Sequence, residues 1–252
     1  MSFDRFFKQV GNDWQQFGLM GIGPLLIGIV TSMVMAVISI ILMGPGIFAM
    51  IRAEQFGGPG PGDLFAFFGS FAGFFILALA VGAISGGLSY AGLVGSVVGY
   101  RRGERASLGA FWQHATRHFG KMVLLGLIVA AIMLVAMLLS AVLLIIPPLG
   151  ILVMLLVPGL ITLNLGLYPA YLIIAEDRPV TEAVGIGFRL ITSHFVDTLL
   201  GTLIFWGFLL ATGAVAAVPV IGWIVTAVFA QPLITYFFID RFELEVRPKL
   251  QI

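Results

Sequence analysis

The chain has 252 residues, of which 60% are hydrophobic and 10% are charged, and its formal net charge is +1. Soluble domains contain about a quarter charged residues, so this composition is typical of an integral membrane protein and argues against a nucleic-acid partner. The chain has no cysteine, which excludes disulfides, thiolate metal sites and cysteine-based catalysis.

The N-terminal segment predicts an amphipathic helix at the membrane surface. Its apolar residues recur at the spacing i, i+3, i+4, i+7 and i+11, which places on one helical face Phe3, Phe6, Phe7, Val10 and Trp14. The segment contains both acidic and basic residues, and the apolar run behind it is too long for a cleaved signal peptide. We therefore expect the N-terminus to be retained.

Six apolar segments without a charged residue or a histidine follow. Helices of about 19 to 27 residues match a hydrocarbon core of about 30 Å, so each segment predicts one membrane crossing. The predicted crossings are Leu19–Met43, Phe74–Tyr100, Met122–Ile146, Ile151–Ala175, Leu199–Val218 and Ile221–Ile239. The predicted fold class is an all-α polytopic integral membrane protein, with residues 1–252 in a single transmembrane domain.

The connection between the first two crossings is unlike the others. Residues 44–63 include the sequence GGPGPGD, which is typical of a flexible connector, and they predict a long outer loop. The apolar stretch that follows, Leu64–Ala72, is too far from Arg101 to belong to one straight crossing. It could instead form a short re-entrant or interfacial helix on the outer side.

The spacing of the N-terminal helix recurs twice, each time directly before a pair of crossings. The second copy is Leu108, Phe111, Trp112, Ala115 and Phe119, and the third is Val184, Gly187, Phe188, Ile191 and Phe195. Ser107 and Thr181 are the expected N-caps. The pattern predicts a threefold repeat of interfacial helix and hairpin over 1–100, 101–175 and 176–240, with a tail at 241–252. The alternative is that any amphipathic segment before a membrane helix has this spacing by chance.

The basic residues predict the orientation. If the N-terminus is cytoplasmic, Arg52 is the one basic residue in an outer loop and all others lie inside. By the positive-inside rule we expect both termini in the cytoplasm and the chain in the bacterial cytoplasmic (inner) membrane.

Two groups of residues are candidate binding sites. The densest basic cluster predicts contact with anionic lipid headgroups, or it only fixes the topology; it comprises Arg101, Arg102, Arg105, Arg117 and Lys121. Asn164 and Gln231 lie near prolines in the fourth and sixth crossings, where broken helices could form a polar site within the membrane. Proline kinks satisfied by neighbouring helices are the alternative.

No pattern indicates catalysis, and we expect no catalytic residue, no metal and no cofactor. His114 and His118 share a helical face, but the sequence HATRH lacks the glutamate of an HExxH zinc site. The GxxxG patterns at 82–86 and 95–99 predict close helix packing and place the second crossing at the centre of the bundle.

Residues 167–190 resemble a group of bacterial membrane proteins. The matching features are Tyr168-Pro169, the Ala-Glu-Asp turn at 175–177, Ala183, and Phe188-Arg189-Leu190. In these the chain is similar to YciC-type proteins and to the membrane domain fused to some glycerophosphodiester phosphodiesterases. The resemblance implies an α-helical inner-membrane protein with no assigned chemistry, and Gly187 departs from it, because a serine is expected there.

Two functions follow as hypotheses. The first is a non-enzymatic membrane protein whose cytoplasmic interfacial helices contact lipid headgroups, a protein partner or a second copy of the chain. The alternative is a carrier or exporter component for an apolar or lipid-like molecule, with the fourth and sixth crossings along its path. An enzyme is disfavoured, because acid-base and nucleophilic catalysis need polar groups within reach of each other.

Overall fold

A computed structural model of the chain describes residues 3–55, 58–218 and 221–250. The described residues form helices and turns without a β-strand, which confirms the all-α class. The chain divides into two compact units. Unit 1 comprises Met1–Leu25 and Gly87–Ile252, and unit 2 comprises Leu26–Gly86. The prediction of a single transmembrane domain stays a prediction.

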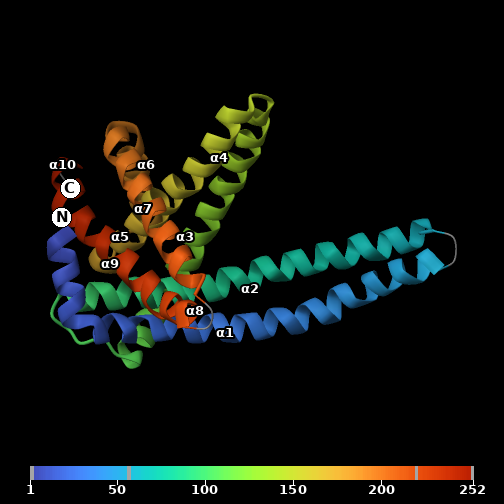
Figure 1. Ribbon diagram of the computed structural model, residues 1–252, viewed down its shortest axis with the longest axis horizontal. Coiled ribbons are helices and arrows are strands. Elements are labelled where there is room, and N and C mark those ends of the chain that lie inside the picture. The colour runs from blue at the N-terminus through green and yellow to red at the C-terminus, as the bar shows by residue number, and fades with distance from the viewer. Residues whose placement is uncertain (1–2, 56–57, 219–220, 251–252) are drawn as a thin grey trace. The chain divides into compact units, whose positions relative to one another are not determined.

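The helices follow one another with few connecting residues (Figure 1). The α-helices are α1 (Phe3–Gln55), α2 (Pro61–Arg101), α3 (Leu108–Val142), α4 (Pro147–Ile161), α5 (Tyr168–Glu176), α6 (Val180–Ser193), α7 (Phe195–Ala216), α8 (Ile221–Val225), α9 (Gln231–Arg241) and α10 (Arg247–Leu250). A 3₁₀ turn, η1 (Leu143–Ile145), follows α3. Three π-helical segments lie between α-helices: η2 (Thr162–Leu167), η3 (Thr226–Ala230) and η4 (Phe242–Val246).

Within the described residues, five helices are long and apolar enough to cross a membrane, as a multi-pass membrane protein requires. They are Arg5–Gln55, Pro61–Arg101, Leu108–Val142, Gly150–Glu176 and Phe195–Ala216. They contain most of each of the first five predicted crossings. The sixth predicted crossing, Ile221–Ile239, is not among them, because it covers α8, η3 and most of α9 rather than one long α-helix.

The prediction of a long outer loop at residues 44–63 is wrong. Helix α1 continues to Gln55 and α2 begins at Pro61, so the described part of the turn is only Gly58–Gly60. Leu64–Ala72 lies inside α2 and is not a separate helix. The physical reason is that a backbone in hydrocarbon must satisfy its own hydrogen bonds, so a helix continues through glycines that would end it in water.

The three predicted interfacial helices differ in structure. The first is the beginning of α1, which bends at Asp13 (φ −121°, ψ 27°), whose carboxylate accepts a 2.5 Å hydrogen bond from Tyr100. The second continues without a break into the rest of α3; Ser107 is its N-cap, as predicted, and accepts a hydrogen bond from the Ala110 amide at 3.1 Å. The third is the separate helix α6, where the predicted N-cap Thr181 is wrong because Pro179 occupies that position.

The core of unit 1 forms around the C-terminal part of α2, the η2–α5 segment and α9. Its buried side chains include Val94, Val97, Tyr168, Leu172 and Phe238. Glycines let the helices approach closely: a Cβ on Gly92 would overlap the ring of Phe111, and one on Gly95 would overlap His114. The second GxxxG pattern therefore packs as predicted. Gly82 and Gly86 of the first pattern face open space.

Two π-helical segments each present a backbone carbonyl to a glycine. A Cβ on Gly187 of α6 would overlap the carbonyl oxygen of Asn164 in η2, and a Cβ on Gly21 of α1 would overlap that of Val228 in η3. A π-helical turn leaves carbonyls out of the regular hydrogen-bond register. Only a residue without a side chain allows the facing helix to pack against such a carbonyl.

Unit 2 is a helical hairpin made from the end of α1 and the beginning of α2 (Figure 1). The two arms touch at Gly46, which lies against Ser70 and Phe67. Most of the large apolar side chains of the hairpin are exposed, among them Phe48, Phe65 and Phe68. A hairpin of this kind has no core of its own, as expected of helices whose outer faces contact lipid.

Candidate functional site

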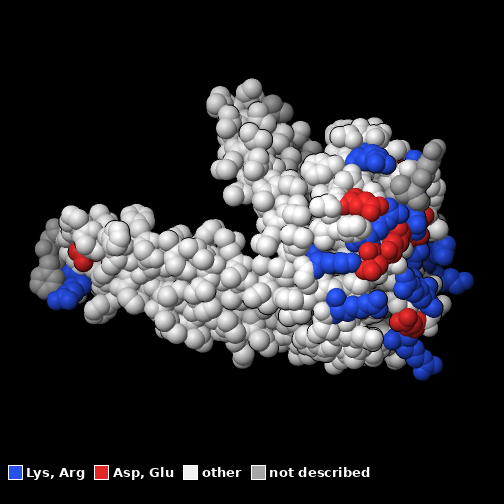
Figure 2. All heavy atoms as spheres, turned by 180° about the vertical axis from the view of Figure 1, so that it is seen from behind, with Lys and Arg blue, Asp and Glu red and all other residues white. Residues whose placement is uncertain are grey.

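On the face that Figure 2 shows, the charged side chains of unit 1 gather on one part of its surface. They come from the ends of helices that are far apart in the sequence, including α2, α5, α6 and α10. Acidic and basic side chains alternate there, and most of them form ion pairs. We call the turn at the middle of these contacts, residues 175–178, the acidic turn.

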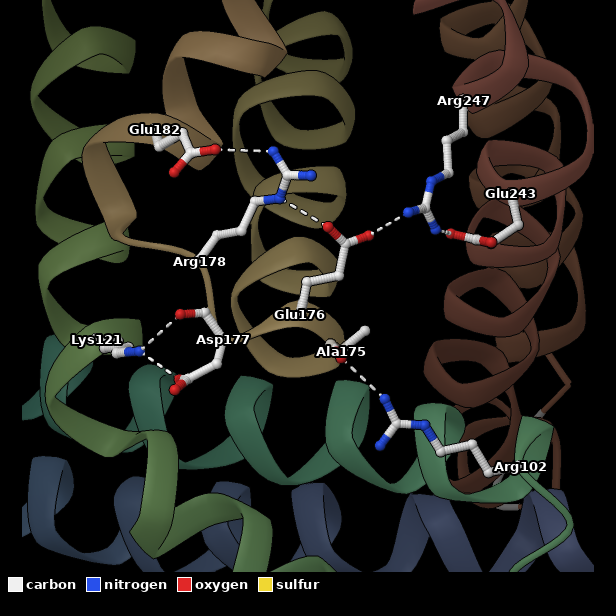
Figure 3. Close-up of polar contacts among 9 residues, drawn as sticks. All are labelled: Arg102, Lys121, Ala175, Glu176, Asp177, Arg178, Glu182, Glu243 and Arg247. Carbon is white, nitrogen blue, oxygen red and sulfur yellow. Dashed lines mark hydrogen bonds and ion pairs between the residues drawn. The ribbon is translucent and has the colours of Figure 1, made fainter. Parts of the chain in front are cut away.

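The acidic turn connects α5 to α6 and contacts α3 and the residue that follows α2 (Figure 3). Asp177 adopts the left-handed conformation (φ 54°) in which helices commonly end. Its carboxylate lies 2.5 Å from the Nζ of Lys121 in α3. The carbonyl of Ala175 accepts a hydrogen bond of 2.9 Å from Arg102, which follows α2. The turn therefore holds α2 and α3 together.

Glu176 extends these contacts to the C-terminal segment. Its carboxylate lies 2.6 Å from Arg178 Nε and 2.8 Å from Arg247 Nη2 (Figure 3). Arg178 also pairs with Glu182 of α6 at 2.8 Å, and Arg247 pairs with Glu243 at 2.9 Å. One carboxylate thus bridges two guanidinium groups and ties α10 to the beginning of α6.

These pairs stabilise the ionised forms of their members. The hydrogen bond and the positive charge of Lys121 hold the pKa of Asp177 below its usual value. The hydrogen bond to Glu176 raises the pKa of Arg178. A lowered carboxylate pKa contributes stability at neutral pH, which is lost as the pH falls through that pKa. The ion pair of Asp177 with Lys121 therefore stabilises the fold at neutral pH more than in acid.

A second set of ion pairs is buried near the end of α9. Arg101 Nη2 lies 3.2 Å from Asp240 Oδ1, and the Asp240 side chain is only 4% exposed. Arg101 also donates to the carbonyl of Ile239 at 3.4 Å. The neighbouring Arg241 donates to the carbonyl of Asp197 at 3.1 Å and pairs with Glu245 at 3.3 Å.

The five predicted headgroup residues fall into two groups. Arg101, Arg102 and Lys121 are engaged by partners within the protein. Arg105 and Arg117 are exposed, and neither forms an ion pair with any residue that the structure describes. Lys8 and Arg189 share these two properties within the described ranges. We call these four residues, Lys8, Arg105, Arg117 and Arg189, the unpaired basic residues.

The apolar faces of the three predicted interfacial helices are only partly buried. Phe6, Phe111, Ala115 and Val184 pack into unit 1. Phe119 is half-buried. Five other aromatic side chains of these faces are exposed: Phe7, Trp14, Trp112, Phe188 and Phe195. These exposed aromatic residues occur in the same segments as the unpaired basic residues.

The two predicted intramembrane polar residues lie in different surroundings. Asn164 is fully buried in η2 and donates a 2.9 Å hydrogen bond to the Leu160 carbonyl, while its Oδ1 has no hydrogen-bond partner among the described residues. Gln231 begins α9 and is exposed. A polar site that joins them stays a prediction.

The histidines of α3 lie side by side. The rings of His114 and His118 are stacked with their centroids 6.4 Å apart and their planes 17° apart. Within residues 3–55, 58–218 and 221–250, no group of three or more His, Cys, Asp or Glu side chains could hold a metal ion.

Comparison of the chain with protein-family models, with characterised proteins and with solved structures finds no match. The resemblance to YciC-type proteins therefore stays an expectation. The arrangement of residues 175–178 gives its Ala-Glu-Asp turn a physical meaning, since each of the three residues binds a basic side chain from another part of unit 1 or from the turn itself.

Sequence reasoning missed the buried charges at the end of α9. Asp240 and Arg241 directly follow an apolar segment, which suggested a helix end exposed to water. Their partners Arg101 and Asp197 are far away in the sequence, and no local pattern identifies such pairs. The sequence did contain one signal: an aspartate and an arginine stand side by side at the end of a long apolar run. Charges that are buried in such a place need partners, so this pair pointed to ion pairs within the protein.

Proposed function

We propose that this chain is a non-enzymatic multi-pass protein of the bacterial cytoplasmic membrane that binds anionic phospholipid headgroups with its unpaired basic residues. The strongest support is that the basic side chains of unit 1 fall into two groups, those that form ion pairs within the protein and those that do not. Six of the twelve arginines and lysines of unit 1 pair with described acidic groups of the protein, whereas four others, Arg105, Arg117, Arg189 and Lys8, are exposed and have no ion-pair partner among the described residues.

The exposed aromatic residues support the same proposal. Tryptophan and phenylalanine next to basic residues are common where a protein meets the headgroup layer, because the ring is apolar and the cation attracts phosphate. Trp112 lies between Arg105 and Arg117 in the sequence, Phe188 precedes Arg189, and Trp14 follows Lys8. Each basic residue near an anionic surface contributes about 1 kcal/mol of attraction.

The proposed topology places both termini and the unpaired basic residues in the cytoplasm. It also counts the segment Ile221–Ile239 as a sixth crossing, since an even number of crossings returns the C-terminus to the side of the N-terminus. The support is the charge pattern: Arg52 is the one basic residue that this topology places outside.

Replacing Arg105, Arg117 and Arg189 together with glutamine tests the proposal. We expect the affinity for phosphatidylglycerol to fall at least about tenfold, since three charges of about 1 kcal/mol each are lost, with no change for phosphatidylcholine. Lipid titration of the purified protein in an uncharged detergent, read by native mass spectrometry, measures both affinities. The control is Arg52→Gln, which removes an exposed arginine outside this set. Unchanged phosphatidylglycerol affinity of the triple variant would contradict the proposal.

A further inference from the structure

Unit 2 carries an open groove near its turn, and the proposed function gives this groove no role. The groove has a volume of about 650 Å³ and lies between the end of α1 and the beginning of α2. Its walls are Ile47, Met50, Ile51 and Glu54 of α1, Phe67 of α2 and the Gly58–Pro59 turn. Ligand sites of small molecules have volumes of about 300–1,000 Å³ and similarly apolar walls with a few polar groups.

Glu54 supplies the one charge among the lining residues, and nothing described in the chain neutralises it. It forms no ion pair within the described residues of the hairpin. Arg52 is two residues away, and at about 100° per residue it projects to the opposite side of α1. Asp63, the nearby acidic residue of α2, accepts a hydrogen bond of 3.0 Å from the Gly60 amide and does not line the groove.

The groove lies near the ends of the uncharged stretches of the hairpin, and this position decides which kind of ligand can enter it. Arg52, Glu54 and Asp63 end the uncharged stretches of α1 and α2, so they mark where the two helices meet water. The apolar walls, Ile47 and Met50, lie up to two turns further along α1 toward the uncharged stretch. A ligand that enters from the interface would meet the carboxylate with its polar end and the apolar walls with the rest.

We propose that this groove binds lipophilic monovalent cations, that is, apolar molecules that carry one amine or other positive group. The Glu54 carboxylate attracts the charge, the ring of Phe67 offers a face suited to a cation, and the aliphatic side chains bury the apolar part. The same carboxylate repels anionic amphiphiles, so the ligands expected in this groove differ in charge from those proposed for the unpaired basic residues of unit 1.

Two ions of nearly equal size and opposite charge test this directly: tetraphenylphosphonium and tetraphenylborate. Equilibrium dialysis of the full chain in an uncharged detergent, corrected for uptake by empty micelles, measures both affinities. The comparison uses a background variant in which Lys8, Arg105, Arg117 and Arg189 are replaced with glutamine, so that the basic surface of unit 1 does not take up the anion. We expect this variant to bind the phosphonium and exclude the borate. Glu54→Gln should weaken phosphonium binding by up to about fivefold, because an ion pair of an exposed carboxylate contributes up to about 1 kcal/mol. The matched control is Asp63→Asn, which removes a nearby carboxylate outside the groove and should leave binding unchanged.

A second variant keeps the test independent of any effect of glutamine on folding. Glu54→Lys reverses the charge at an exposed position, and we expect it to abolish phosphonium binding and permit borate binding. Equal affinity of the background variant without these four basic residues for the two ions would overturn the proposal and indicate a groove for uncharged lipid tails. Phosphonium binding that neither Glu54 variant changes would also overturn it.

Discussion

Gly187→Ala is expected to lower the free energy of unfolding by about 3 kcal/mol, the upper part of the range for overpacked interiors. The added methyl group would overlap the carbonyl oxygen of Asn164 in η2, and a backbone carbonyl cannot move aside as the end of a flexible side chain can. Either α6 or the π-helical segment must shift, and both belong to the core of unit 1. Unfolding by sodium dodecyl sulfate in mixed micelles, followed by circular dichroism, measures the change.

The matched control lies two residues earlier in the same helix. Gly185 is exposed, and a Cβ there has no atom within 4 Å. Gly185→Ala should be neutral or stabilising by up to about 1 kcal/mol, because alanine favours a helix more than glycine does. If both variants have the same stability as the original chain, the close contact between α6 and η2 does not exist.

Arg101→Ala is expected to destabilise the protein by about 3 kcal/mol, because it leaves the buried carboxylate of Asp240 without its cation. Asp240 Oδ2 has no hydrogen-bond partner among the described residues, so within them Arg101 is the ion-pair partner on which this carboxylate depends. The same unfolding measurement applies. Arg105→Ala is the control, since it removes an exposed arginine of the same cluster and should change the stability by less than about 0.5 kcal/mol.

A double variant distinguishes loss of the ion pair from loss of side-chain volume. Arg101→Met with Asp240→Leu removes both charges and keeps apolar volume, so it should be more stable than Arg101→Ala alone. A double variant that is no more stable than the single one would show that Arg101 contributes through packing instead. Equal effects of Arg101→Ala and Arg105→Ala would contradict the buried ion pair.

The sequence predicted the helices well because long apolar runs have few alternatives in a membrane. The predicted long loop at residues 44–63 is wrong. In water, glycine and proline commonly end a helix, but in hydrocarbon the backbone has no water to bond and keeps its helical hydrogen bonds. Only Pro59 and the glycines around it mark the real turn. The end of α3 and the start of α4 were predictable from Pro147 and Pro148, since proline favours the first turn of a helix.

The candidate site was less predictable than the fold. The pattern of basic residues could not separate Arg101 from Arg105, because the difference is a partner of Arg101 that lies in α9. Gly187 looked like a departure from a family pattern. Its reason is the facing carbonyl of Asn164, which a periodicity analysis cannot show because η2 is π-helical.

Labelling of single cysteines shows on which side of the membrane the unpaired basic residues lie. The chain has no cysteine, so Arg105→Cys and Glu54→Cys each introduce one reporter thiol. A membrane-impermeant maleimide applied to intact spheroplasts should label position 54 and should label position 105 only after the membrane is permeabilised. Labelling of position 105 in intact spheroplasts would place the basic surface outside and contradict the account.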